Sequence, residues 1–167
     1  SGFEEGVRMG PMVSKGQRAK CHAQVEDAVA KGARLLMGGE IPAGDGAFYP
    51  ATVVADIPAD STLLTEETFG PVVCLYRFDG SEEESVRLGN DSIYGLAANV
   101  YSSDEDKAVR IAKQLRFGQI GINRYISSAP GSPWVGARQS GHGYLGGIEG
   151  HRQFSSPKSV TDTNPDA

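Results

Sequence analysis

The sequence has little of several features that mark particular protein classes. Only 2 of its 167 residues are cysteine, so it lacks the disulfide framework of a small secreted domain, and a reducing, cytoplasmic location is expected. Its 16 basic residues are outnumbered by 21 acidic ones, which argues against a nucleic-acid partner. No apolar run approaches the roughly 20 residues of a membrane span, and the first residues do not resemble a signal peptide. These absences exclude nucleic-acid binding and membrane insertion and leave a globular protein.

Helix-like and strand-like segments alternate along the chain, which predicts an α/β fold. Ser14 and Ser81 are each followed three positions later by Gln or Glu, the form of a helix-capping box. We expect helices over 15–31, 82–90 and 104–117, a helical turn after Ser61, and strands over 35–37, 48–54, 72–78, 97–101 and 119–123. An irregular loop over 124–147, a short helix near 148–154 and a last strand near 158–162 complete the chain. This order predicts a layered domain with a mostly parallel sheet.

No residue pattern indicates a nucleophile or a metal site. Residues 141–146 fit G-x-G-x-x-G, but the dinucleotide fingerprint needs a strand directly before it and an acid about 20 positions later, so a glycine-rich turn is the better interpretation. Cys21 and His22 are adjacent on an expected helix and do not face each other. Cys74 lies in an apolar strand, where cysteine is commonly a small inert hydrophobe. The 3 histidines lack metal-ligand spacing. We therefore predict no catalytic and no metal-binding residue in this chain.

The most informative stretch is 66–73, Glu-Glu-Thr-Phe-Gly-Pro-Val-Val. Gly70 and Pro71 end a loop, and the β-branched residues after them favour a strand, so Glu67 and Phe69 are presented where a rigid strand begins. A carboxylate can accept two hydrogen bonds from the adjacent hydroxyls of a ribose, and an aromatic ring two residues later can pack on the attached heterocycle. The alternative is a solvated acid beside a core phenylalanine. The local pattern leaves both interpretations open.

Eight motifs in a fixed order extend over almost the whole chain. They are Met-Gly-Pro-Met-Val-Ser at 9–14 and the segments 31–39, 48–54, 66–72, 90–98, 118–123, 133–141 and 158–160. Together they resemble the C-terminal part of the NAD(P)-dependent aldehyde dehydrogenases. The resemblance implies part of a three-layer, Rossmann-like fold, NAD or NADP as cofactor and an aldehyde as substrate. It also implies a homodimer or homotetramer for the intact enzyme, with the strand at 158–162 extending a sheet across the subunit interface.

The resemblance further implies roles for individual residues. Glu67 would bind the hydroxyls of the nicotinamide-side ribose, and Phe69 would contact the nicotinamide ring. The loop over 124–134 would run along the tunnel through which the aldehyde enters. Trp134 would be an aromatic residue lining that tunnel, and Ser128 would occupy a variable specificity position. With Ser127, it is compatible with a polar or carboxylate-bearing aldehyde such as a semialdehyde.

The groups that perform the family's chemistry are not found among these residues. That chemistry needs a cysteine thiolate that attacks the aldehyde, a glutamate that activates water, and an oxyanion-stabilising amide. In the family these groups and the Rossmann domain lie N-terminal to the stretch that the motifs match, and neither Cys21 nor Cys74 matches the nucleophile. We therefore expect a fragment that is inactive alone. The alternative is a non-catalytic remnant or split subunit that acts in association.

Overall fold

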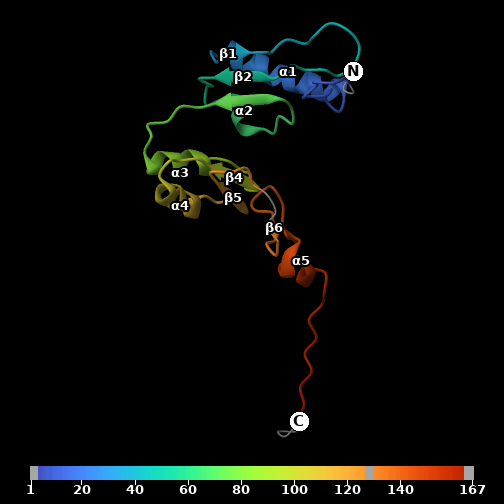
Figure 1. Cartoon of the computed structure of the whole chain (residues 1–167), viewed down its shortest axis with the longest axis vertical. Coiled ribbons are helices and arrows are strands. Elements are labelled where there is room, and N and C mark those ends of the chain that lie inside the picture. The colour runs from blue at the N-terminus through green and yellow to red at the C-terminus, as the bar shows by residue number, and fades with distance from the viewer. Residues whose placement is uncertain (1–3, 127–129, 164–167) are drawn as a thin grey trace. The chain divides into compact units, whose positions relative to one another are not determined.

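Helices and strands alternate in the computed structural model, which describes residues 4–126 and 130–163 (Figure 1). The α/β class expected from the sequence is thereby confirmed. The chain divides into two units, residues 1–78 and 79–167, each containing helices and paired strands.

The first unit begins with a helix that is capped where the sequence predicts it. The elements are α1 (Lys15–Ala30), β1 (Arg34–Met37), β2 (Thr52–Ala55), α2 (Thr62–Thr65) and β3 (Val72–Leu75). The side-chain oxygen of Ser14 accepts a hydrogen bond from the backbone N–H of Gln17 at 3.0 Å. Gly32, with a φ of 107°, follows the end of α1 in a conformation that glycine adopts without strain. Both ends of α1 are therefore set by local sequence.

The core of the first unit lies between α1, α2 and β2. Cys21, Val25 and Ala28 of α1 are buried and lie on one face of the helix, because residues three and four positions apart are neighbours on its surface. The spacing of the apolar residues predicts that Val29 shares this buried face with Cys21, Val25 and Ala28, but Val29 is 41% exposed. The core cluster consists of Val25, Ala28, Ala33, Val54, Ile57 and Leu63, with Leu64 and Val72 packed against it.

The sheet of the first unit is mixed, whereas the sequence predicted a mostly parallel one. Its strand order is β1-β2-β3, with β1 antiparallel and β3 parallel to β2. The stretch over 38–51 that joins β1 to β2 contains no helix. Parallel neighbours need a crossover connection, usually through a helix, and α2 supplies one only between β2 and β3. Strands β2 and β3 are also shorter than the expected 48–54 and 72–78.

The second unit contains a strand–helix–strand arrangement and a small hairpin. Its elements are α3 (Glu82–Asn90), β4 (Ala97–Val100), α4 (Glu105–Gln114), β5 (Gln119–Ile122), β6 (Trp134–Val135), β7 (Tyr144–Leu145) and α5 (Gly147–Gln153). Strands β4 and β5 are parallel and are connected through α4, which buries Ala108, Ile111 and Ala112. Strands β6 and β7 are antiparallel. Strand pairs of both directions thus occur in the described residues of this unit as well.

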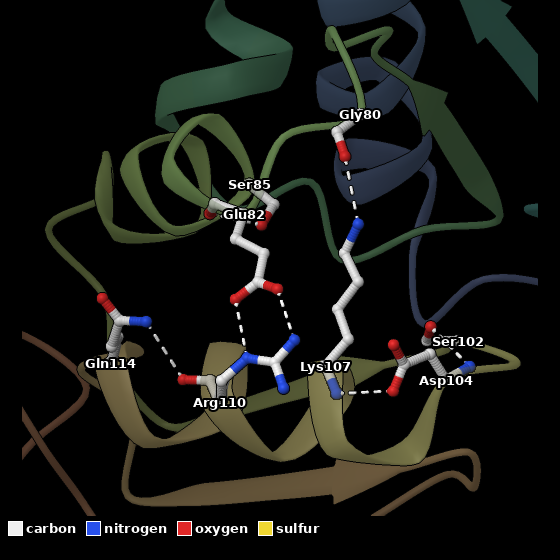
Figure 2. Close-up of polar contacts among 8 residues, drawn as sticks. All are labelled: Gly80, Glu82, Ser85, Ser102, Asp104, Lys107, Arg110 and Gln114. Atoms are coloured by element: carbon white, nitrogen blue, oxygen red, sulfur yellow. Dashed lines mark hydrogen bonds and ion pairs between the residues drawn. The ribbon is translucent and has the colours of Figure 1, made fainter.

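Helices α3 and α4 are joined by polar contacts (Figure 2). The guanidinium of Arg110 donates to both carboxylate oxygens of Glu82, at 2.7 and 3.2 Å. Lys107 donates from Nζ to the carbonyl oxygen of Gly80 at 3.2 Å. The hydrogen bond from Arg110 is the main reason that the pKa of Glu82 lies below its ordinary value. Because Arg110 is exposed and Glu82 is only half-buried, this ion pair contributes little to stability.

Two expectations for the last quarter of the chain differ from the structure. The stretch over 124–147 is not wholly irregular, because it contains β6 and β7; strands of two residues are too short to produce a periodic pattern. Residues 158–162 form no hydrogen-bonded strand and are exposed. A strand exists through its ladder with a neighbour, and a segment expected to pair with a second subunit has no such neighbour in one chain. That pairing stays a prediction.

Candidate functional site

The expected cofactor contacts lie on a short loop, residues 66–70, between α2 and β3. On one side, the N–H of Glu66 donates to the carbonyl oxygen of Thr62 at 2.9 Å and closes α2. On the other side, the carbonyl oxygen of Pro71 accepts from the N–H of Thr52 at 2.8 Å, at the first residue of β2. The 66–70 loop is therefore fixed at both ends to regular structure.

Glu67 and Phe69 both lie on the surface of the first unit. Phe69 is 75% exposed, so it is not a core phenylalanine of this unit. Its φ of 45° lies in the left-handed region, which a bulky residue rarely adopts. Glu67 is exposed as well. The loop thus presents a carboxylate and an aromatic ring outward, with the ring residue in a strained backbone conformation.

A hollow of about 460 Å³ lies beside Phe69. It is lined by residues 9–13, by Gln17 and by residues 69–71, and its side chains are mostly apolar. Its volume falls in the range of about 300–1,000 Å³ that is usual for small-molecule sites. Phe69 is one of the lining residues, so a ligand in the hollow would lie against it.

Side chains from the first two turns of α1 bind the backbone of the 66–70 loop. Gln17 donates from Nε2 to the carbonyl oxygens of residues 68 and 69, at 2.7 and 3.3 Å. Lys20 donates from Nζ to the carbonyl oxygen of residue 67 at 3.1 Å. Cys21 donates from Sγ to the carbonyl oxygen of residue 68 at 3.1 Å. Three consecutive loop carbonyls therefore accept hydrogen bonds from one helix.

The hydrogen bonds from α1 to the 66–70 loop were not predicted from the sequence. The capping-box pattern predicts that the Gln17 side chain turns back to the backbone of Ser14, but its amide nitrogen reaches the loop instead. The one signal available was spacing, since residues 17, 20 and 21 share a helix face. Nothing local indicated that this face lies against a loop about 50 positions further along the chain.

The two cysteines differ in surroundings. Cys21 is completely buried, and burial raises the pKa of its thiol, an effect that the nearby Gln17 and Lys20 only partly oppose. Cys74 was expected to be buried in an apolar strand but is exposed, because β3 is an edge strand of its sheet in the first unit. Neither thiol has a histidine base among its hydrogen-bond partners in the described residues.

The described residues contain neither a candidate metal site nor a membrane-spanning helix. No cluster of three or more His, Cys, Asp or Glu side chains there has the arrangement of a metal site. No helix there combines the length and the apolar character that crossing a bilayer requires.

The expected tunnel residues belong to the second unit. Trp134 begins β6, pairs with Leu145 of β7 and is half-buried. Ser128 and its neighbour Ser127 lie outside the described residues. Asn123 follows β5 with a φ of 51°, and its side-chain oxygen accepts a hydrogen bond from the N–H of Ser102 at 2.8 Å. The structure thus keeps Glu67 and Phe69 together on one loop and describes Trp134 in the other unit.

Comparison with known proteins gives consistent matches at the level of sequence. Residues 1–160 match the sequence model of the aldehyde dehydrogenase family. A succinate-semialdehyde dehydrogenase of Paenarthrobacter nicotinovorans is 38% identical over 98% of this chain and 36% of the relative. The mitochondrial succinate-semialdehyde dehydrogenase of Mus musculus is 38% identical over 96% of this chain and 30% of the relative. The chain thus spans about a third of the length of these relatives.

Solved structures give the same picture for the fold. An apo mutant form of betaine aldehyde dehydrogenase from Staphylococcus aureus superposes with a TM-score of 0.90 at 38% identity, over 99% of this chain and 34% of that protein. The succinate-semialdehyde dehydrogenase of Burkholderia pseudomallei superposes with a TM-score of 0.85 at 40% identity, over 92% of this chain and 32% of that protein. A structure of the Staphylococcus enzyme in complex with NAD+ superposes with a TM-score of 0.85 at 38% identity, over 92% of this chain and 31% of that protein.

Proposed function

The chain belongs to the aldehyde dehydrogenase family, and we propose from this that it forms part of an enzyme that oxidises an aldehyde to a carboxylic acid with NAD or NADP. The observation that carries the proposal is the 66–70 loop, which holds an exposed Phe69 beside an apolar hollow and an exposed Glu67 two residues away. A nicotinamide nucleotide has a planar ring attached to a ribose with two adjacent hydroxyls, and both parts match what the loop offers.

The residues present fit such a cofactor, and their proposed roles are those of binding. The phenyl ring of Phe69 packs against the nicotinamide ring, and the carboxylate of Glu67 accepts hydrogen bonds from the ribose hydroxyls. The bound cofactor supplies the hydride acceptor of the oxidation. Trp134 is proposed to line the aldehyde tunnel.

We propose that the chain corresponds to the C-terminal third of the family's sequence and is inactive without the rest. Its share of each relative, about a third, does not by itself locate the match. The resemblance of the eight motifs to the C-terminal part of the family supports this assignment. Inactivity is supported by both thiols: Cys21 is completely buried and donates to a backbone carbonyl, and the exposed Cys74 has no histidine base among its hydrogen-bond partners in the described residues.

Fragment complementation tests this assignment. The 167-residue chain is mixed with the N-terminal two thirds of the Paenarthrobacter relative, and NADH or NADPH formation is followed with succinate semialdehyde. Activity of the mixture alone supports the proposal. Activity of the chain by itself contradicts the proposed inactivity, and complementation of the C-terminal two thirds instead would assign the chain to the N-terminal part of the family. Glu67→Gln and Phe69→Leu in the active mixture should raise the KM for the cofactor.

For the substrate, we propose an aldehyde that bears an anionic group. One relative is a succinate-semialdehyde dehydrogenase and another is a 3-sulfolactaldehyde dehydrogenase, and both of these substrates carry such a group. The polar Ser127 and Ser128 in the expected tunnel loop are compatible with it. The active mixture should oxidise succinate semialdehyde with a higher kcat/KM than butanal. A preference for butanal would contradict the proposal.

A non-catalytic association module is the second candidate function. It is favoured by apolar side chains exposed on both edge strands of the first sheet, namely Leu35, Leu36 and Met37 on β1 and Val73 and Leu75 on β3. Exposed apolar edges pair readily with other chains. Failure of both complementation mixtures, together with a stable homo-oligomer in light scattering, would favour this candidate. Removal of residues 158–167 would then test whether the last segment joins the subunits.

A further inference from the structure

The backbone of the 66–70 loop is held by hydrogen bonds from α1 rather than by its neighbours in the sequence. The carbonyl groups of residues 67, 68 and 69 lie between α2 and β3 and belong to neither element. Polar backbone groups outside helices and strands need other partners when water is partly excluded. All three receive them from α1, through Gln17, Lys20 and Cys21.

Gln17 and Cys21 together fix the two peptide groups on either side of Phe69. The carbonyl of Thr68 belongs to the peptide before Phe69, and it accepts from both Gln17 Nε2 and Cys21 Sγ. The carbonyl of Phe69 belongs to the peptide after it and also accepts from Gln17. The φ and ψ of a residue are the rotations that relate its two flanking peptide planes. Holding both carbonyls therefore holds Phe69 at its φ of 45°.

The thiol of Cys21 also forms the surface on which the loop rests. A Cβ atom on Gly70 would lie 2.2 Å from Cys21 Sγ, so the loop backbone is in direct contact with the sulfur. Because burial keeps this thiol protonated, it remains a hydrogen-bond donor. Lys20 contributes less, since its side chain is 47% exposed and exposed contacts of lysine are weak.

We propose that Gln17 and Cys21 are positioning residues that hold Phe69 in its left-handed conformation and keep its ring on the wall of the hollow. The inference rests on the proposed function, in which that ring contacts nicotinamide. Neither side chain needs to touch the reacting atoms, because both act through the loop backbone.

Matched variants of the full 167-residue chain test the proposal. Gln17→Glu removes the amide donor at constant size and suits the first turn of a helix, so folding is retained. Cys21→Ala removes the thiol donor, and Cys21→Ser restores a donor. Gln114→Glu is the control, because Gln114 donates from Nε2 to the Arg110 carbonyl at 3.1 Å on α4, far along the chain from the loop (Figure 2).

The first measurement is amide hydrogen exchange of Glu66 and Val72, whose N–H groups donate to Thr62 and Gly70 at 2.9 and 2.8 Å on the two sides of the loop. Loss of one neutral hydrogen bond, as in Cys21→Ala, should speed this exchange about fivefold, and loss of the two from Gln17 should speed it at least as much. We expect the effect in Gln17→Glu and Cys21→Ala, recovery in Cys21→Ser, and none in Gln114→Glu. Exchange equal to wild type in both Gln17→Glu and Cys21→Ala would overturn the proposal.

The second measurement is a titration with NAD+ followed by NMR shifts of residues 66–70. If the wild type binds, Gln17→Glu and Cys21→Ala should raise the dissociation constant by about fivefold, in line with the same lost hydrogen bonds. Equal affinity of wild type and variants would refute the positioning role while leaving the cofactor role intact. If the wild-type chain alone shows no NAD+-dependent shifts, the same titration of its mixture with the N-terminal two thirds of the Paenarthrobacter relative tests the cofactor role, and absence of shifts there contradicts it. The exchange rates decide separately whether Gln17 and Cys21 hold the loop.

Discussion

Replacement of Gly118 by alanine should displace β6 and the proposed tunnel residue Trp134. Gly118 lies between α4 and β5, and a Cβ atom there would lie 2.0 Å from the carbonyl oxygen of Val135 and 3.2 Å from its Cβ. Real Cβ atoms essentially never have a contact below 3.0 Å, so the two segments must separate by at least the 1.0 Å difference. The neighbour is backbone of β6 and has no flexible end that can rotate away.

The magnitude follows from the cost of overpacking. Forcing an extra methyl group into a closed contact typically destabilises by about 1–3 kcal/mol. In a unit of this size, each kcal/mol lowers the melting temperature by about 4–8 °C, so we expect a fall of roughly 4 °C or more. The chain has 1 tryptophan, so its fluorescence reports on β6 directly. Gly118→Ala should shift the Trp134 emission to longer wavelength and make it more accessible to acrylamide.

Gly80→Ala is the control for Gly118→Ala. It separates the effect of the close contact with Val135 from the general effect of replacing a glycine by alanine. Gly80 has a φ of 88°, and nothing lies within 4 Å of the position of its Cβ. Gly80→Ala should therefore lower stability through backbone strain alone and leave Trp134 emission unchanged. If Gly118→Ala melts and fluoresces like the wild type, the close approach of β6 to Gly118 is wrong.

Three further outcomes follow from single contacts. Ser81→Ala removes the oxygen that accepts from the N–H of Glu84 at 3.1 Å at the start of α3, and should cost about 1 kcal/mol in urea unfolding. Gln24→Met should stabilise the first unit, by up to about 1–3 kcal/mol in the same assay, because both amide atoms of Gln24 are buried without a hydrogen-bond partner among the described residues. The hydrogen bond from Lys31 lowers the pKa of Asp27 below its ordinary value of 3.8. The ion pair therefore stabilises the folded state fully above that pH, and this stabilisation is lost as the pH falls through the folded-state pKa. Asp27→Asn should therefore reduce the urea midpoint at pH 7 more than at pH 2, and an equal reduction at both would contradict this ion pair.

The parts of the fold that the sequence predicted are those with local causes. Ser14, Ser61 and Ser81 cap the helices they precede, because a cap involves residues two or three positions apart. Gly32 follows α1 in its left-handed conformation for the same reason. The expected loop position of Glu67 and Phe69 was right as well, since Gly70-Pro71 marks the turn into β3.

What could not be predicted depends on residues distant in the sequence. The reach of Gln17 to a loop 51 positions away has no counterpart in the pattern around Gln17. The antiparallel pairing of β1 with β2 depends on the absence of a helix between them, and the exposure of Cys74 depends on β3 being at a sheet edge. The capping-box rule gave the correct helix start but assigned the Gln17 side chain to the wrong partner.

The left-handed backbone of Phe69 determines which residues a screen for stability would favour at position 69. A side chain in that conformation costs roughly 1–2 kcal/mol, whereas glycine avoids this cost and loses about 0.5–1 kcal/mol through the freedom of its unfolded chain. With the ring 75% exposed, little buried area is lost on its removal. A library randomised at position 69 and screened for heat resistance should therefore enrich glycine and asparagine. The same library screened for turnover of the assembled enzyme should keep phenylalanine, and the divergence of the two screens would separate what this residue does for the fold from what it does for the ligand.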